Sequence, residues 1–192
     1  MSQRSVSPSR RQEELFEAAY QYVLAHGLAD LSLRPLAAAI GSSPRVLLYL
    51  YGSKEELVRA LLARAREDEL AFLGPALALA ADQLDLSTAI RSTWQWLAEA
   101  EHRSLLCLWV EAYARSLIEP EGPWASFAAR TVGDWLDLLA AAQPARHRRT
   151  RAGLAERTAA LAMLRGALLD LLATGDVTRT TAAVEAYVRS MS

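Results

Sequence analysis

Apolar residues recur along most of the chain at every third or fourth position, as they do on one face of an α-helix. The first such stripe runs from Leu15 to Val23 and ends before Gly27. Glycine suits the left-handed backbone that commonly follows a helix. No segment alternates apolar and polar residues for long enough to predict a strand. The pattern therefore predicts an all-α protein of about nine helices.

Glycine, proline and capping residues divide the first third of the chain into short helices. Ser32 is the expected N-cap of the second helix, which Gly41 ends. Pro44 opens a third helix that ends before Gly52. Because only residues 41–43 join the second and third helices, there is too little chain for them to lie antiparallel. We expect them to cross steeply, as in a helix-turn-helix.

The remaining two thirds of the chain predict six further helices. Ser53 and Glu56 form a capping box that begins the first of these, and Gly74–Pro75 is expected to end it. The other five are predicted over residues 87–102, 104–118, 124–142, 154–173 and 178–191, the last with Thr178 as its cap. The basic segment 146–151 is interpreted as a loop. We expect two domains, 1–53 and 54–192.

One face of the third predicted helix has the chemistry of a DNA-binding surface. Arg45, Leu48 and Tyr49 share that face. The inward face is expected to be formed by Leu47, Leu50 and Tyr51. An arginine can bind guanine or phosphate, a tyrosine hydroxyl can donate to phosphate, and Leu48 or Val46 can contact a thymine methyl. The alternative is that these are ordinary surface side chains of a small bundle.

Composition removes several other classes of protein. The chain has 192 residues and a net charge of −1, which excludes a polybasic binder. Apolar residues make up 52%, which excludes extensive disorder. The single cysteine, Cys107, rules out an intramolecular disulfide, and we expect it to be a buried, unreactive thiol in a cytoplasmic protein. No segment is long and apolar enough to predict a membrane span.

Residues 27–57 resemble the DNA-binding segment of the TetR family of bacterial transcriptional regulators. The matching positions, without a gap, are Gly27, Ser32, Leu36, Ala37, Ile40, Gly41, Ser43, Leu47, Tyr51, Ser53, Lys54, Glu55 and Leu57. The resemblance implies DNA contacts from Ser32, Arg34, Ser42, Ser43, Pro44, Arg45, Val46, Leu48, Tyr49 and Lys54. Leu48 stands where the family often has tyrosine, and Leu50 where it often has histidine, so a phosphate contact or the base preference can differ here.

The resemblance also implies a homodimer that binds a palindromic double-stranded operator, usually as a repressor, and is released by a small effector. The effector would be hydrophobic or aromatic, in a pocket for which the candidates are Trp94, Trp109, Tyr113, Trp135 and Met163. The candidates for the dimer interface, on the last two helices, are Leu164, Leu168, Val184, Tyr187 and Val188. The alternative for both sets is that they complete the core of a single chain.

A different class of function, an all-helical enzyme or metal-binding bundle, is suggested by Glu99 and His102, which have the Glu-x-x-His spacing of di-iron ligands. Such a site needs a second copy of the motif and two more carboxylates. Neither His26 nor His147 has a glutamate three residues before it. We therefore interpret His102 as a helix-end residue and predict no metal, no cofactor and no enzymatic activity. A helical adaptor that binds only protein would leave the basic and aromatic face at Arg45 unexplained.

Overall fold

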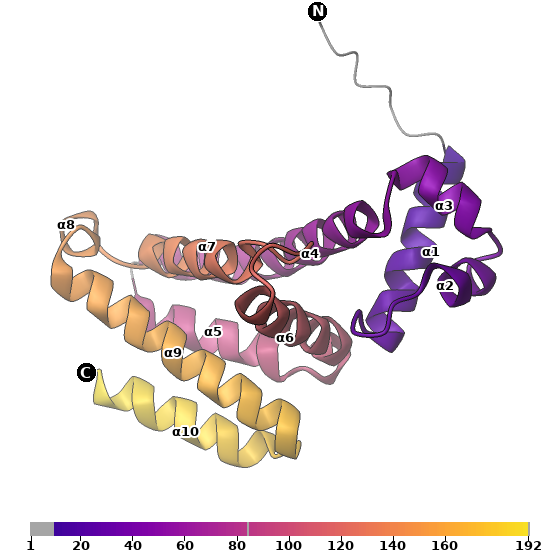
Figure 1. Ribbon diagram of the computed structural model, residues 1–192. Coiled ribbons are helices and arrows are strands. Elements are labelled where there is room, and N and C mark those ends of the chain that lie inside the picture. Colours follow the sequence, from indigo (N-terminus) through magenta and orange to yellow (C-terminus); the bar gives the residue numbers. More distant parts are fainter. Residues whose placement is uncertain (1–9, 84, 192) are drawn as a thin grey trace, which may run out of the picture.

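The computed structural model describes residues 10–83 and 85–191, so residues 1–9 of the first predicted domain lie outside it. The described residues are all-α, with no strand, and form ten α-helices and one short 3₁₀ helix (Figure 1). These are α1 (Arg10–His26), α2 (Leu33–Ala39), α3 (Pro44–Tyr51), α4 (Lys54–Gln83), α5 (Leu86–Ala98), η1 (Ala100–His102), α6 (Arg103–Ile118), α7 (Phe127–Ala141), α8 (Ala145–Arg148), α9 (Arg151–Thr174) and α10 (Val177–Ser190). The predicted class is confirmed, and the number of helices exceeds the predicted nine. None of the described helices has the length and apolar character that a membrane crossing requires.

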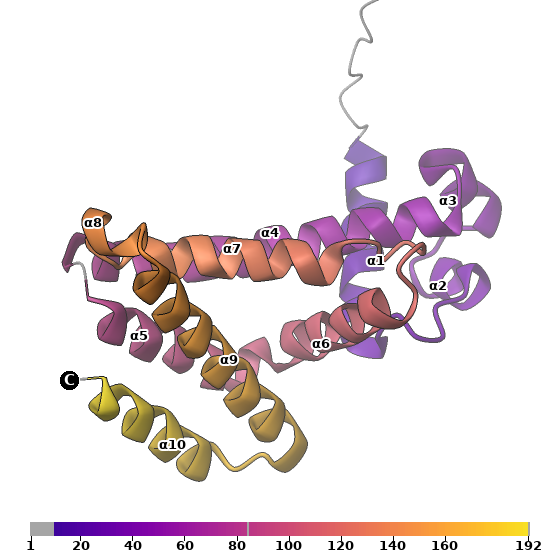
Figure 2. The ribbon, with the colours of Figure 1, turned by 60° about the vertical axis from the view of Figure 1, so that its left-hand side comes forward.

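The largest difference from the prediction is the length of α4, which continues through Gly74–Pro75 to Gln83. A proline inside a helix costs about 3 kcal/mol. However, α4 packs against α5, α6 and α7 (Figure 2). This packing outweighs the local preference for a break, so the predicted end at Gly74–Pro75 is wrong.

Capping side chains set two boundaries that differ from the prediction. Asp176, and not Thr178, caps α10, because its carboxylate accepts a hydrogen bond from the backbone N–H of Arg179 at 2.9 Å. The Thr150 hydroxyl accepts from the backbone N–H of Gly153 at 3.0 Å, so α9 begins before the predicted residue 154. The basic segment 146–151, interpreted as a loop, overlaps α8 and reaches the first residue of α9, so that interpretation is wrong for those residues.

Two other helix ends are also displaced. Trp124 precedes α7, because Ser126 has a left-handed backbone with φ 61° and the helix begins only at Phe127. His102 does not end the fifth predicted helix. It lies in η1, since α5 stops at Ala98 and Glu99 is extended.

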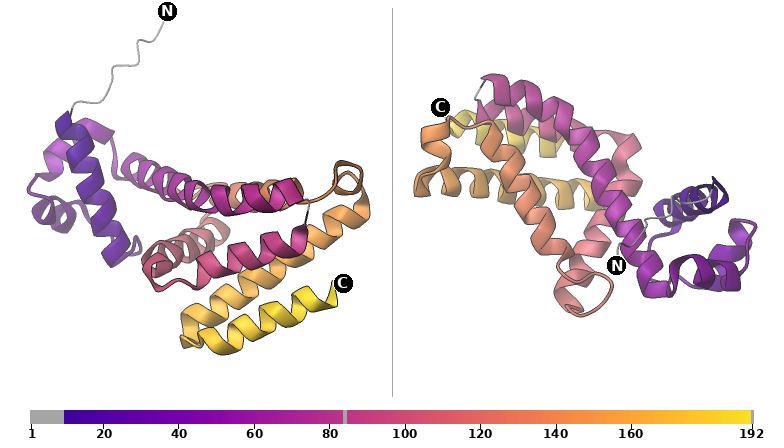
Figure 3. Two further views of the ribbon diagram at one scale, coloured as in Figure 1. Left: turned by 180° about the vertical axis from the view of Figure 1, so that it is seen from behind. Right: turned by 90° about the horizontal axis from the view of Figure 1, so that it is seen from above.

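The helices α1–α3 form a head at one end of the molecule, and α9 and α10 lie away from it at the other side of the body (Figures 1 and 3). Only Gly52 and Ser53 separate α3 from α4, which runs from the head into the body. Buried Leu57 and Leu61 of α4 belong to the same core as Leu36 of α2. The head is therefore packed onto the first turns of α4.

Candidate nucleic-acid interface and ligand cavity

The third helix, α3, presents a large exposed face at the surface of the head. Tyr49 is 87% exposed, Leu48 is 43% exposed and Val46 is 39% exposed, and Arg45 is exposed as well. Leu47, by contrast, is fully buried. Leu50 and Tyr51 are partly buried. The predicted division of this helix into an inner and an outer face is confirmed.

Local capping explains how α3 is held in this orientation. The Ser43 hydroxyl accepts a hydrogen bond from the backbone N–H of Val46 at 3.3 Å, and Pro44 fills the first helical position. Gly41, with φ 64°, provides the left-handed residue that ends α2. Leu36 of α2 is buried and supports the turn. At the other expected cap, Ser32 occupies the N-cap position of α2, but its side chain makes no capping hydrogen bond.

Three exposed cations lie on α3 and on the helices that come before and after it. Arg34 lies at the start of α2, Arg45 on α3 and Lys54 at the start of α4, and all three are exposed. None of the three forms an ion pair with any residue that the structure describes. The Ser53 hydroxyl accepts from the backbone N–H of Glu56 at 3.0 Å, which caps α4 beside Lys54 as predicted. The surface therefore combines unneutralised positive charge with helix N-termini, which favour phosphate.

The body contains a small, partly enclosed cavity between helices α4, α5, α6, α7 and α9. Its volume is about 10 Å³. The residues that line it are Glu69, Leu97, Trp109, Trp135, Leu164, Arg165 and Leu168. Glu69 is only 2% exposed, and its Oε1 accepts a hydrogen bond from Nε1 of Trp135 at 3.0 Å. An ionisable group this deep in an apolar core is unusual and costly.

Arg165 enters the cavity from α9 and is held by two aromatic rings. Its guanidinium carbon lies 5.0 Å from the centroid of the Tyr113 ring and 5.5 Å from that of the Trp109 ring. Its Nη1 donates to the Tyr113 hydroxyl at 3.3 Å. Burial lowers the pKa of Arg165 from its ordinary value, and burial raises the pKa of Glu69 to about 7. The cavity thus places a permanent cation near a carboxyl group that titrates at neutral pH.

Solved structures match almost the whole chain. A TetR transcriptional regulator from Legionella pneumophila is 16% identical, covers 97% of this chain and 99% of its own, and has a TM-score of 0.70. A TetR transcription regulator from Haloarcula marismortui is 18% identical, with coverages of 91% and 92% and a TM-score of 0.69. The multidrug binding protein EbrR, complexed with imidazole, is 25% identical, with coverages of 98% and 96% and a TM-score of 0.70. The chain has the TetR-family fold.

That fold supports the resemblance seen in residues 27–57, which lie in the head from Gly27 to the first turn of α4. No protein-family model matches the chain, and no curated protein matches it in sequence. The neighbours with this fold are described as transcriptional regulators or, for EbrR, as a multidrug binding protein.

Within the TetR-family fold, three of the five predicted pocket residues come together. Trp109, Tyr113 and Trp135 surround Glu69 and Arg165. The other two are displaced from this group, because Trp94 donates to the Thr181 hydroxyl of α10 at 2.9 Å, and Met163 does not line the cavity.

Sequence reasoning missed Glu69 and Arg165, the two charged residues of the cavity. A signal was present, because each takes a position that continues an apolar helical stripe. Glu69 follows Leu61 and Ala65 at intervals of four residues. Arg165 lies between Leu161 and Leu168 at intervals of four and three. A charged residue on a buried stripe is rare unless it is paired.

The predicted dimer residues lie inside the chain's own core. Leu164, Leu168, Val184 and Val188 are at most 3% exposed, and Tyr187 is partly buried. Their burial follows from the packing of α9 and α10 on each other and on α5. Four of the five are therefore unavailable to a second chain, and the surface of these two helices is formed by other residues.

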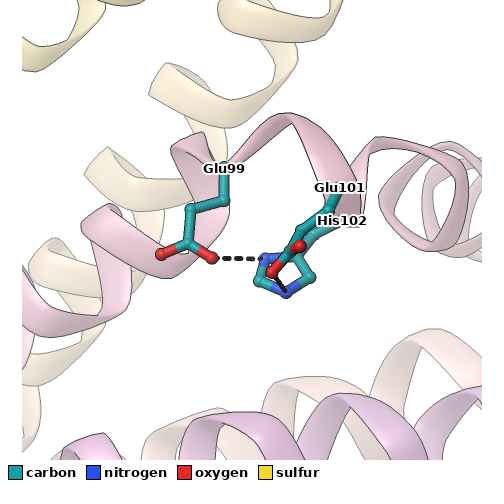
Figure 4. A group of neighbouring side chains, drawn as sticks. All are labelled: Glu99, Glu101 and His102. Atoms are coloured by element: carbon teal, nitrogen blue, oxygen red, sulfur yellow. Dashed lines mark ion pairs between the residues drawn. The ribbon is translucent and has the colours of Figure 1, made fainter.

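Cys107 and the Glu-x-x-His segment also differ from expectation. Cys107 is exposed, because it lies on the outer face of α6, and the prediction of a buried thiol is wrong. His102 stacks on Trp96 with 4.2 Å between ring centroids, and its Nδ1 lies 2.8 Å from the Trp96 carbonyl. Figure 4 shows Glu99 and Glu101 beside the His102 ring. Nδ1 of His102 lies 3.6 Å from Oε2 of Glu99, and its Nε2 lies 3.5 Å from Oε1 of Glu101.

These contacts give His102 a structural role. The Trp96 carbonyl engages one ring nitrogen, and both carboxylates are exposed side chains at a short 3₁₀ turn. Exposed acidic groups of this kind are common without an ion. The arrangement supplies one imidazole and lacks the second Glu-x-x-His that a di-iron bundle requires.

Proposed function

We propose that this protein is a ligand-responsive transcriptional regulator, a repressor that binds a palindromic DNA operator as a homodimer. Residues 1–53 would form the DNA-binding domain, and residues 54–192 the effector-binding and dimerisation domain of a cytoplasmic protein. The observation that carries the proposal is the exposed face of α3, where Arg45, Leu48 and Tyr49 stand clear of the core. A helix with such a face, braced by a preceding short helix, enters the major groove.

Each side chain of this surface has a definite role in the proposal. Arg45 would bind a guanine edge or a phosphate, and Val46 and Leu48 would contact thymine methyl groups. Tyr49 would donate its hydroxyl to a phosphate. The remaining contacts would be to the phosphate backbone and would come from Ser32, Arg34, Ser42, Ser43, Pro44 and Lys54. Phosphate contacts orient the protein, and base contacts select the sequence.

The dimer interface would be the outward face of α9 and α10. On α9 one stripe of exposed residues recurs at intervals of four and three, and most of its members are small: Ala155, Ala159, Ala162, Gly166 and Leu169. A Cβ added at Gly166 would meet no described atom within 4 Å, so its own chain does not require a glycine there. Glycine inside a helix costs about 1 kcal/mol relative to alanine. Close approach of a partner helix would offset that cost.

The exposed face of α10 supports the same occupant. It also presents small residues, Ala182, Ala183 and Ala186. Two such helices from each of two copies would form a four-helix bundle in which the backbones approach closely. The occupant we propose is therefore a second copy of this chain.

Release by an effector would act through α4. This helix carries Lys54 at the edge of the head and Glu69 at the cavity. A small hydrophobic ligand in the body would shift α4 and change the separation of the two heads. Such a ligand weakens DNA binding by its preference for one of the two states, typically by 1–3 kcal/mol.

Selection of bound DNA from a random pool tests this function. The expected result is an inverted repeat whose half-sites are separated by a whole number of helical turns, with binding that weakens as salt increases. Arg146→Ala, an exposed change on α8, serves as a control that leaves selection unchanged. Failure to enrich any sequence, or enrichment of a site without two-fold symmetry, would contradict the proposal.

A further inference from the structure

Four polar atoms of the residues that line this cavity have no hydrogen-bond partner among the residues that the structure describes. They are Oε2 of Glu69, Nε1 of Trp109, and Nε and Nη2 of Arg165. Each is buried, and a buried polar atom without a partner costs about 1–3 kcal/mol, or more when it is charged. A cavity of about 10 Å³ has room for about one water molecule. One water cannot satisfy all four atoms at once, so the cavity carries unused hydrogen-bonding capacity.

The unsatisfied hydrogen-bonding atoms are mostly donors. Three of the four atoms are donors, and only Oε2 of Glu69 can accept. Nε and Nη2 of Arg165 lie on one edge of the guanidinium, the edge that matches the two oxygens of a carboxylate. The third nitrogen, Nη1, is already engaged by Tyr113. A partner rich in acceptors, with two oxygens side by side, fits this arrangement best.

The residues around the guanidinium indicate what kind of group would be attached to those two oxygens in a ligand. Trp109 and Trp135 line the cavity together with Leu97 and two leucines of α9. The ring of Trp109 stacks on that of Tyr113, with 5.0 Å between centroids. Apart from Glu69 and Arg165, the lining is therefore apolar and consists of two tryptophans and three leucines. A flat apolar body suits such walls.

We propose that this cavity binds an aromatic carboxylic acid, whose carboxylate pairs with the Nε–Nη2 edge of Arg165 while its ring packs on Trp109 and Trp135. That the acid acts as an effector rests on the proposed function, whereas its binding does not. The carboxyl group of protonated Glu69 donates its O–H to the bound carboxylate. The bound ligand then provides hydrogen-bond partners for both the Nε–Nη2 edge of Arg165 and the carboxyl group of Glu69.

The charges around Glu69 set the pH dependence of this binding. Arg165 faces it from α9, Asp134 from α7 and Arg66 from its own helix, and burial is the largest cause of its raised pKa of about 7. Asp134 is itself paired with Arg66, through bonds of 2.5 and 2.6 Å. A bound carboxylate adds negative charge and favours protonated Glu69. Affinity therefore falls by up to about tenfold per pH unit above 7.

A ligand with a ring is larger than this cavity, so some of the helices that line it must move apart to admit it. These helices include α4 with Glu69, α7 with Trp135 and α9 with Arg165. Glu69 lies about 22 Å along α4 from Lys54, at a rise of 1.5 Å per residue. If α4 moves on binding, the helix that is joined directly to the head is displaced.

The test uses benzoate as the probe and the full-length protein. Tryptophan fluorescence and thermal unfolding are measured with benzoate, benzyl alcohol and benzylamine at pH 6, 7 and 8. We expect benzoate to change the fluorescence and raise the unfolding temperature, and the other two to have little effect. Arg165→Lys keeps the charge but loses the two-nitrogen edge, and should weaken benzoate at least tenfold. Arg146→Lys on α8 is the matched control.

Glu69→Gln provides a second test that does not depend on the folding of the Arg165 variant. It should bind benzoate with an affinity that no longer changes between pH 6 and pH 8. Preference for benzylamine, equal binding of benzoate and benzyl alcohol, or no binding of any probe would each overturn the proposal. Benzoate binding by a protein that selects no DNA would overturn the proposed function alone.

Discussion

The carboxylate of Glu111 on α6 accepts a hydrogen bond from the backbone N–H of Leu28 at 2.8 Å, across 83 residues of sequence. Leu28 follows α1, so the bond joins the head directly to the body. Gly27, with φ 77°, makes the close approach possible, because a Cβ there would lie 2.9 Å from Oε2 of Glu111. The head is therefore attached to the body at a second point besides α4.

Loss of this bond should lower stability and loosen the head. Glu111→Ala leaves the Leu28 N–H without a partner, and we expect a loss of about 1–3 kcal/mol in the free energy of unfolding. Urea denaturation measures it. Glu111→Gln retains an acceptor oxygen and should lose less. Equal stability of the alanine variant and the wild type would show that this contact contributes nothing to holding the head.

Substitution of the unpaired cations should separate base reading from phosphate binding. Arg45→Ala should weaken operator binding by about 1–3 kcal/mol and relax the preference at one base pair, if Arg45 reads a guanine. Lys54→Ala should weaken binding to all DNA sequences equally, and the slope of the logarithm of affinity against the logarithm of salt concentration should become smaller by about one. Titrations of DNA at several salt concentrations measure both effects. Arg146→Ala should match the wild type, and an Arg45 variant that also matches it would mean that α3 does not read the operator.

A charge on the outward face of α9 should dissociate the dimer. Ala162→Glu places two carboxylates against each other across a two-fold interface, where like charges repel. Sedimentation velocity at micromolar concentration should show monomers. Ala129→Glu, at an exposed position of α7, is the matched control and should remain dimeric. A dimeric Ala162 variant would place the interface elsewhere.

The buried carboxyl of Glu69 should make stability depend on pH. Its pKa is raised from 4.5 to about 7 in the folded protein, mainly by burial, so the folded state retains a proton that the unfolded state has lost. This contribution to the free energy of unfolding is fully present below about pH 4.5 and is lost as the pH rises toward 7, at roughly 1.4 kcal/mol for each pH unit between those two values. Urea denaturation at pH 5 and pH 8 should show a smaller difference for Glu69→Gln than for the wild type. An identical difference in both proteins would refute the raised pKa.

The helix boundaries of the head were predicted from the sequence more accurately than those of the body. Its boundaries depend on local signals, such as the cap at Ser43, the proline after it and the left-handed glycine at position 41, and these act within a few residues. The end of α4 depends on packing against other helices, α5, α6 and α7, which local signals do not report, so the end predicted at Gly74–Pro75 was wrong.

The choice of faces on α9 and α10 shows the same limit. Periodicity identifies an apolar stripe, but it does not say whether the stripe faces its own chain or a partner. Leu164 and Val184 proved to be core residues, and the opposite, alanine-rich face was overlooked because alanine gives a weak hydrophobic signal. Of the predicted pocket residues, Trp109, Tyr113 and Trp135 come together but Trp94 and Met163 do not. Glu69 and Arg165 were not singled out from the sequence because they lie on apolar stripes.

The two-residue junction of Gly52 and Ser53 has a consequence for engineering. Leu57 and Leu61 of α4 share one hydrophobic core with residues of the head, and Arg64 lies 5.2 Å from the ring centroid of Tyr20 on α1. A chimaera cut at the junction would therefore expose apolar residues of the head that are buried here. A transplantable module would need to carry α4 as far as Arg64. To join this head to a different ligand-binding domain, the two helices would have to be fused in the correct rotational register, because no flexible linker separates the head from α4.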